Sequence, residues 1–285
     1  MSIPPNVTPE FAEHRRLDAL QAARAAALVV NQNFRLGVHA DEKSNPHDLV
    51  TSVDRQSQEI ITDHLLRSLP GSWVLGEEGD DSTQNHAAGA VQWIVDPIDG
   101  TSNFVHGVAF FAISIAAAVD GQLIAAAIVD PISQDEFSAN LDTAFLNDQP
   151  LHPSPRPEQT RANLMTDYPG AESIGVDGTL ALELLGQWIV DFATVRRKVC
   201  AALSLAHVAA GWCDAVIGFD TKIWDVAAGA HLVTVTGGSY RGLRYDDTKG
   251  PAHAAPGFIA QGPGANYPSL ARAADRIIAA RRDAQ

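Results

Sequence analysis

The sequence predicts a mixed α/β protein with two packed subdomains, and three observations support this fold class. Apolar residues recur at helical spacing near the N-terminus. Two apolar runs further along are joined by Asp120-Gly121, a dipeptide favoured in two-residue hairpins. Strand and helix patterns then alternate through the second half of the chain. At 285 residues and 46% hydrophobic content, the chain can bury a substantial core.

Two amphipathic helices are predicted first. One runs from Thr8 to about Leu36, with Thr8 as its N-cap. A loop without periodicity follows, from Gly37 to Pro46, and it carries Lys43. The second helix has Thr51 or Ser52 as its cap, and Asp54 lies in its N-terminal turn.

An antiparallel sheet is predicted next, interrupted by an exposed acidic loop from Asp80 to Ala90. Its strands cover Trp73 to Leu75, Trp93 to Val95, Phe110 to Val119 and Leu123 to Val129. The proline-rich segment from Pro150 to Pro157 is the clearest break in composition. It divides the chain into an N-terminal subdomain, residues 1–150, and a C-terminal subdomain, residues 151–285.

The C-terminal subdomain is predicted to alternate strands and helices, which indicates α/β layering. The strands cover Asn163 to Thr166, Ala193 to Val195 and Ala215 to Gly218. The helices cover Thr179 to Trp188, Cys200 to Ala210, Trp224 to Val235 and Tyr267 to Arg281.

Charge and targeting signals limit the possible partners and compartments. The formal charge of −14 disfavours nucleic acid and anionic membranes, because such binding depends on clustered Lys and Arg. The longest apolar stretch, Val108 to Val119, is too short to span a bilayer, and the N-terminus lacks a secretory pattern. We therefore expect a cytoplasmic protein. A phosphate ester remains a possible substrate if divalent cations separate it from acidic side chains.

Asp96 and Asp99 are the first candidates for chemistry. They lie three residues apart at the end of an apolar strand, with Pro97 in the turn between them. Because hard cations such as Mg²⁺ prefer oxygen ligands, two carboxylates and the Ile98 carbonyl predict a metal cradle. The backbone N–H groups of Gly100 and Thr101 are candidates for binding phosphate oxygens. The alternative is an ordinary surface turn, but the apolar flanks place these carboxylates near a core.

Four motifs resemble the inositol monophosphatase family. The run from Trp93 to Phe104 resembles its first signature, and the run from Trp224 to Gly229 its second. Gly76-Glu77-Glu78 and the block that contains Lys43 and Asp54 also resemble family motifs. The resemblance implies a layered αβαβα sugar-phosphatase architecture, two to three Mg²⁺ ions, sensitivity to lithium and a homodimer.

The resemblance also implies a role for each matching residue. Glu77, Asp96 and the Ile98 carbonyl would hold one Mg²⁺, and Asp96, Asp99 and Asp225 a second. Thr101 would hydrogen-bond to Asp54, and the pair would activate the attacking water. Taken alone, Asp54 and Asp225 could instead complement helix dipoles, Glu77 could be an exposed turn residue and Lys43 a solvated lysine.

The substrate is less well defined by the sequence. An inositol monophosphate or a related sugar or polyol phosphate is the first expectation. The alternatives are a 3′(2′),5′-bisphosphate nucleotidase, a histidinol-phosphate phosphatase and a non-enzymatic, acidic partner-binding protein. The family pattern has a glutamate where this chain has Gly218, and a glycine is expected where Cys200 stands, so we expect weak selectivity for inositol phosphates. Lys43, Ala202, Gly218 and Lys222 are the candidate substrate-binding positions.

Overall fold

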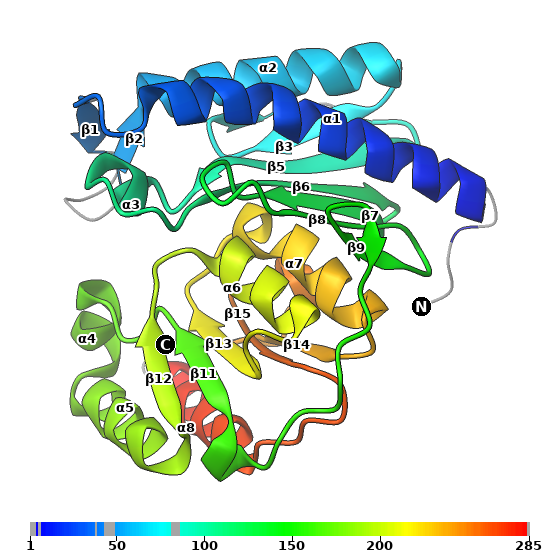
Figure 1. The fold of residues 1–285 in the computed structure, drawn as a ribbon. Coiled ribbons are helices and arrows are strands. Elements are labelled where there is room, and N and C mark those ends of the chain that lie inside the picture. Colours follow the sequence, from blue (N-terminus) through cyan, green and yellow to red (C-terminus); the bar gives the residue numbers. More distant parts are fainter. Residues whose placement is uncertain (1–3, 5–6, 38, 43–48, 81–85, 284–285) are drawn as a thin grey trace.

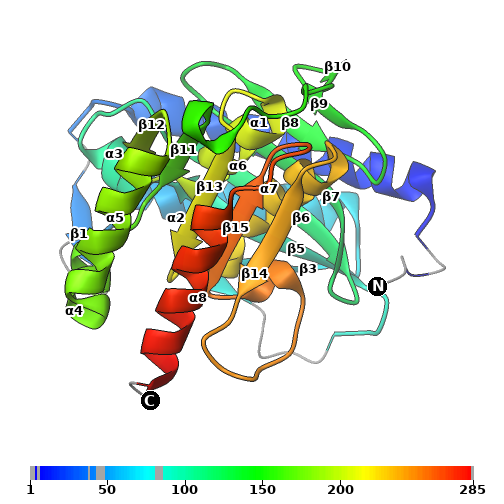
Figure 2. The same ribbon diagram turned by 90° about the horizontal axis from the view of Figure 1, so that it is seen from below.

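The computed structural model describes residues 4, 7–37, 39–42, 49–80 and 86–283, and it confirms the layered αβαβα architecture (Figure 1). The first layer holds α1 (Pro9–Asn33) and α2 (Ser52–Ser68), the third α6 (Ala201–Ala210) and α7 (Ile223–Val235). The fifth holds α4 (Ala171–Asp177), α5 (Thr179–Asp191) and α8 (Pro268–Asp283). Two β-sheets form the second and fourth layers. Figure 2 shows α5 and α8 covering the outer face of the second sheet.

The first sheet has eight strands in the order β10-β9-β8-β7-β6-β5-β3-β4. Its neighbouring strands are antiparallel except for the parallel pair β3 and β5. The turn between β6 and β7 is the predicted hairpin, with positive φ at both Asp120 and Gly121. The bounds are β3 (Trp73–Gly76), β4 (Gly79–Asp80), β5 (Val91–Asp99), β6 (Ala112–Val119), β7 (Gln122–Val129), β8 (Glu136–Ala139), β9 (Ala144–Leu146) and β10 (Gln149–Pro150).

The second sheet has five strands in the order β12-β11-β13-β15-β14. The strands β12, β11 and β13 are parallel, so their carboxyl ends lie at one edge of the sheet. The bounds are β11 (Asn163–Thr166), β12 (Thr194–Arg197), β13 (Ala215–Phe219), β14 (Ser239–Leu243) and β15 (Gly257–Gln261). The one-turn helix α3 (Thr101–Val105) follows β5, and β1 (Ala40–Glu42) pairs with β2 (Leu49–Thr51). Two short 3₁₀ helices cover Gln159–Arg161 and Ala252–Ala254.

Three hydrophobic clusters hold the layers together. Trp93 and Phe111 belong to the cluster between the first helix layer and the first sheet. Leu205 and Phe137 belong to the cluster around α6 and α7, and Trp188 to the cluster beneath α5 and α8. No helix in the described ranges combines the length and apolarity needed to cross a bilayer.

Several element predictions were incomplete. The segment predicted as a loop after α1 contains the short strand β1. The strands β14 and β15 were missed because their apolar patterns are short: β14 has only Tyr240 and Leu243, and the apolar run of β15, Phe258 to Ala260, is three residues long. The strand before Asp96 continues to Asp99, with a shift in its pairing between these two residues. Lys43 and part of the predicted acidic loop lie outside the described residues.

Candidate active site

The parallel pair β3 and β5 brings Glu77 and Asp96 side by side. Gly76 is in register with Val95, so the residues that follow them leave the same edge of the sheet together. The Glu77 N–H donates to the Val95 carbonyl at 3.2 Å. From α2, the Gln58 side chain accepts a hydrogen bond from the Glu78 N–H and donates to the Gly79 carbonyl. The loop that carries Glu77 is thereby fixed against the first layer.

Asp99 is the last residue of β5 and lies against the start of α6. Its Oδ2 accepts hydrogen bonds from the Ala202 backbone N–H at 2.5 Å and from the Cys200 thiol at 3.2 Å. Burial nevertheless raises the pKa of Asp99 to about 7, although these two donors act to lower it. Burial, together with the nearby charge of Asp99, also raises the pKa of the Cys200 thiol. The thiol therefore acts as a neutral hydrogen-bond donor to Asp99.

Asp225 lies in the first turn of α7. Its Oδ2 accepts a hydrogen bond from the Lys222 backbone N–H at 2.8 Å, so Asp225 caps this helix while it also lines the cavity described below. Desolvation and the repulsion of Asp99 raise the pKa of Asp225. Burial and the neighbouring carboxylates, Glu77 first, raise the pKa of Asp96.

Asp54 and Thr101 form the predicted hydrogen bond, with 2.9 Å between the Thr101 hydroxyl and Asp54 Oδ1. The other oxygen, Oδ2, accepts from the Thr51 backbone N–H at 2.8 Å and from the Thr51 hydroxyl. Asp54 is fully buried, and this burial raises its pKa. It therefore caps α2 with one oxygen and accepts the Thr101 hydrogen bond with the other.

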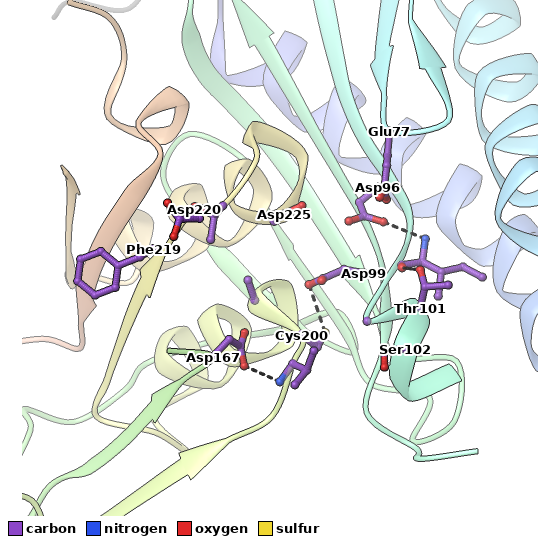
Figure 3. A pocket seen from close by; sticks show the side chains of 15 residues that line it. Glu77, Asp96, Asp99, Thr101, Ser102, Asp167, Cys200, Phe219, Asp220 and Asp225 are labelled. Atoms are coloured by element: carbon purple, nitrogen blue, oxygen red, sulfur yellow. Dashed lines mark hydrogen bonds between the residues drawn. The ribbon is translucent and has the colours of Figure 1, made fainter. Parts of the chain in front are cut away.

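These acidic residues and Thr101 surround one cavity of about 320 Å³, except for Asp54, which lies behind Thr101 (Figure 3). Within the described residues, no three His, Cys, Asp or Glu side chains already converge as a closed metal site. The acids face a shared space. The cavity is lined by Glu77, Asp96, Ile98, Asp99, Gly100, Thr101, Ser102, Asp167, Val199, Cys200, Ala201, Phe219, Asp220, Thr221 and Asp225.

Gly100 connects the acidic strand to α3 in a crowded place. It has φ +93°, and a Cβ there would lie 3.1 Å from the carbonyl oxygens of both Phe110 and Val199. Only glycine combines this backbone angle with so close an approach. The Asn103 side-chain amide also donates to the Lys198 carbonyl at 2.7 Å and thereby ties α3 to the segment after β12.

A second cavity of about 440 Å³ shares Ser102, Asp167, Val199, Phe219 and Asp220 with the first. Asp167 follows β11 and Asp220 follows β13, at the edge where these parallel strands end. Sequence reasoning missed both carboxylates. The signal was available, because each acid comes directly after an apolar strand, and side chains at the carboxyl ends of neighbouring parallel strands meet.

Of the candidate substrate-binding positions, the three that the structure describes line neither cavity. Ala202 is buried and contributes its backbone N–H to Asp99. Lys222 is exposed and does not line either cavity. Gly218 faces Phe258, whose Cε1 would lie 2.5 Å from an added Cβ, so a larger residue at this position would meet the Phe258 ring before it reached a cavity. Lys43 lies outside the described residues.

Cys200 does not occupy a backbone position that requires glycine. Its φ is −163°, which is extended backbone that any residue adopts. The preceding residue, Val199, has φ +55°, an angle that favours glycine. Its N–H donates to the Asp167 carboxylate, and its carbonyl accepts from Asn103 at 3.1 Å. These two bonds hold Val199 in its strained conformation on the cavity wall.

Comparison with known proteins gives consistent results. The model of the inositol monophosphatase family matches residues 13–279. A protein of Pseudomonas aeruginosa named Nus factor SuhB is 37% identical over 222 residues, 77% of this chain and 82% of that protein. An inositol-1-monophosphatase of Rhizobium meliloti is 37% identical over 68% of this chain and 71% of its own. The crystal structure of extragenic suppressor protein suhB from Bartonella henselae has a TM-score of 0.75 and 28% identity, covering 94% of this chain and 98% of that one.

Proposed function

Because this chain belongs to the inositol monophosphatase family, we propose that it is a Mg²⁺-dependent phosphomonoesterase that hydrolyses a small phosphorylated alcohol. One observation carries the proposal. Four carboxylates, Glu77, Asp96, Asp99 and Asp225, line the same cavity as the Thr101 hydroxyl. A non-polar ligand would leave these charges buried without compensation.

The donor set fits hard divalent cations. Burial and neighbouring carboxylates raise the pKa values of Asp96, Asp99 and Asp225, so divalent cations among them would favour their ionised forms. All four acids and the Ile98 carbonyl supply oxygen atoms, the ligands that Mg²⁺ prefers. Two divalent cations would balance the four carboxylates and supply Lewis-acid polarisation of the phosphate ester. Glu77, Asp96 and Ile98 would hold one ion, and Asp96, Asp99 and Asp225 the other.

The remaining residues position the substrate and the attacking water. The Thr101 hydroxyl, oriented by Asp54, is placed to accept a proton from a water molecule while its own proton passes to the Asp54 carboxylate. Gly100 and Thr101 line the cavity at the start of α3, where their backbone N–H groups are candidates to hold phosphate oxygens. The alcohol portion of the substrate then extends toward Asp167 and Asp220.

A phosphate-release assay tests the proposal. We expect release from small sugar, polyol or amino-alcohol phosphates with Mg²⁺, none after chelation, and inhibition by lithium at tens of millimolar. Inositol 1-phosphate, an adenosine 3′,5′-bisphosphate and histidinol phosphate form the panel that separates the alternatives. Turnover that continues in excess chelator would contradict metal dependence. Size-exclusion chromatography would test the expected homodimer, and fractionation the expected cytoplasmic location.

A second candidate is a partner-binding role, because the Pseudomonas aeruginosa relative is named a Nus factor. The acidic residues of the cavity argue for catalysis, since none of the four carboxylates is replaced by a neutral residue. An Asp99→Asn variant separates the two roles. It should abolish phosphate release, and any partner that still binds it would do so through another surface.

A further inference from the structure

Asp220 lies where the alcohol portion of the substrate would extend, but no chemical role has been given to its carboxylate so far. It follows β13, lines both cavities and has a side chain that is 42% exposed. Figure 3 shows Asp167 and Asp220 on the side of the pocket away from Glu77 and Asp96. Asp220 also has φ +60°, an angle that is uncommon for residues other than glycine. Some contact must therefore hold this carboxylate in place.

That contact comes from Arg281 on the C-terminal helix α8. The guanidinium binds both oxygens of Asp220, with 2.5 Å from Nη1 to Oδ1 and 2.9 Å from Nη2 to Oδ2. The same guanidinium binds Asp177 at 2.9 Å and 2.8 Å. Arg281 is only 7% exposed, and its Cζ lies 4.5 Å above the ring of Tyr245. A two-point contact from a buried, stacked arginine fixes the plane of the Asp220 carboxylate.

The charges of this network do not cancel. One guanidinium serves two carboxylates, so a formal charge of −1 remains on the Arg281, Asp177 and Asp220 network. The Asp177 side chain is fully buried and also accepts a hydrogen bond from the Tyr168 hydroxyl at 3.0 Å. Asp220 is the exposed member, so the remaining acceptor capacity faces the cavities. Each carboxylate oxygen can accept a further hydrogen bond beyond the one from Arg281.

We propose that Asp220, positioned by Arg281, selects substrates whose alcohol portion carries a hydrogen-bond donor, either a hydroxyl or an ammonium group. This inference rests on the proposed phosphatase function, because it assumes that the phosphate lies among the four cavity acids. It replaces Gly218 as the specificity determinant: the β13 segment does supply an acidic residue to the substrate pocket, but two residues later.

The test compares three substrates in one assay. Glycerol 2-phosphate carries hydroxyls, phosphoethanolamine carries an ammonium group, and phenyl phosphate carries neither on its alcohol portion. For Asp220→Gly, we expect the kcat/KM of the donor-bearing substrates relative to phenyl phosphate to fall about 10- to 150-fold, as for the loss of a hydrogen bond to a charged group. Glycine adopts the backbone angle of Asp220 without strain, so this variant keeps the fold.

Three further variants complete the test. Asp220→Asn retains an acceptor oxygen without the charge, so it should reduce phosphoethanolamine turnover more than glycerol 2-phosphate turnover if the ammonium group is the preferred donor. Arg281→Lys keeps the positive charge without the two-point contact, so it should raise KM for the donor-bearing substrates more than it lowers kcat. Asp247→Asn, in a fully exposed side chain near α8, is the matched control and should leave the substrate ratio unchanged.

The two possible failures are distinguishable. If the wild type with Mg²⁺ releases phosphate neither from these three substrates nor from inositol 1-phosphate, adenosine 3′,5′-bisphosphate or histidinol phosphate, the proposed function is overturned, and this inference with it. If the wild type turns over substrate but Asp220→Gly leaves the ratio within about twofold, the selection by Asp220 is wrong and the phosphatase function stands.

Discussion

The Thr101 hydroxyl lies 2.9 Å from Asp54 Oδ1 and 2.9 Å from the carbonyl oxygen of Ile98. A hydroxyl has one hydrogen and can donate to only one of these acceptors at a time. Asp54 is held by Thr51 at the start of α2, and Ile98 belongs to the end of β5. The hydroxyl therefore has two alternative acceptors, one of them a buried carboxylate that can share a proton with it.

This arrangement predicts that Thr101→Ala lowers kcat more than it raises KM. A group that accepts a proton from the attacking water acts on the transition state, and its loss costs about 10²- to 10⁴-fold. Thr101→Ser retains the hydroxyl and should keep most of the activity. Steady-state kinetics on any substrate of the panel measures both constants. If Thr101→Ala changed KM alone, Thr101 would be a phosphate anchor.

Divalent metal should stabilise the fold. Ligand that binds only the native state at 100 times its Kd adds about 2.7 kcal/mol to the free energy of unfolding. We therefore expect Mg²⁺ to raise Tm by several degrees over the chelated protein, because the cations relieve the repulsion among the cavity acids. Asp99→Asn should reduce this increase, whereas Asp63→Asn, an exposed carboxylate on α2, should not. Equal Tm values with and without Mg²⁺ in the wild type would contradict a metal site.

The sequence supports prediction of the metal-ligand candidates better than of the substrate pocket, for a physical reason. Asp96 and Asp99 belong to one short segment, so their proximity follows from local geometry. Asp167, Val199 and Asp220 lie on three segments that meet only because β11, β12 and β13 are parallel neighbours. The parallel pairing is a long-range property of the sheet. The alternation of strands and helices in the sequence indicated α/β layers, but it did not determine which strands are neighbours in the sheet.

Some errors came from side-chain direction. Gly218 lies in β13, the strand that leads to the pocket. Within a strand, a side chain two residues further along, such as that of Asp220, would point to the same face of the sheet as position 218. However, β13 ends at Phe219. The side-chain direction of Asp220 is therefore not set by the alternation along the strand, and its carboxylate reaches the cavities. Backbone conformation after a strand ends is set by contacts such as that with Arg281, which lies 61 residues away in sequence.

Gly218→Glu should therefore destabilise the protein without creating a preference for inositol phosphates. Gly218 is in register with Phe258, a fully buried ring that stacks on Tyr240 with 5.4 Å between centroids. Even Gly218→Ala places a methyl group 2.5 Å from that ring and should cost about 1–3 kcal/mol.

Gly186→Ala is the matched control for this prediction. Gly186 lies in α5, and an added Cβ there would meet no atom within 4 Å. Alanine should stabilise that helix by about 0.5–1 kcal/mol. Urea unfolding of the three variants measures the differences. A Gly218→Glu protein with unchanged stability and a gain in inositol phosphate preference would contradict the orientation of Gly218.

Two buried histidines should make stability fall in acid. His231 on α7 donates from Nε2 to the Asn140 carbonyl at 2.8 Å, and His253 lies near it beneath β14. Burial lowers the pKa of both to about 4, and the charge of His231 further lowers that of His253. The ordinary pKa of histidine is about 6.5, so the unfolded chain binds more protons between these two values. The stabilising contribution is complete above about pH 6.5 and is lost as the pH falls toward 4.

His231→Gln tests this sign, because the glutamine amide can still donate to Asn140 but cannot be protonated. Between pH 7 and 4.5, the wild type should lose about 2 kcal/mol more unfolding free energy than the variant, as expected for one group with these pKa values. His152→Gln, at an exposed position, should follow the wild-type curve. Urea unfolding at several pH values, with each variant compared to the wild type in the same buffer, cancels the titration of the cavity acids. Parallel curves for the wild type and His231→Gln would show that His231 has the same pKa in the folded and unfolded states, and would refute the prediction.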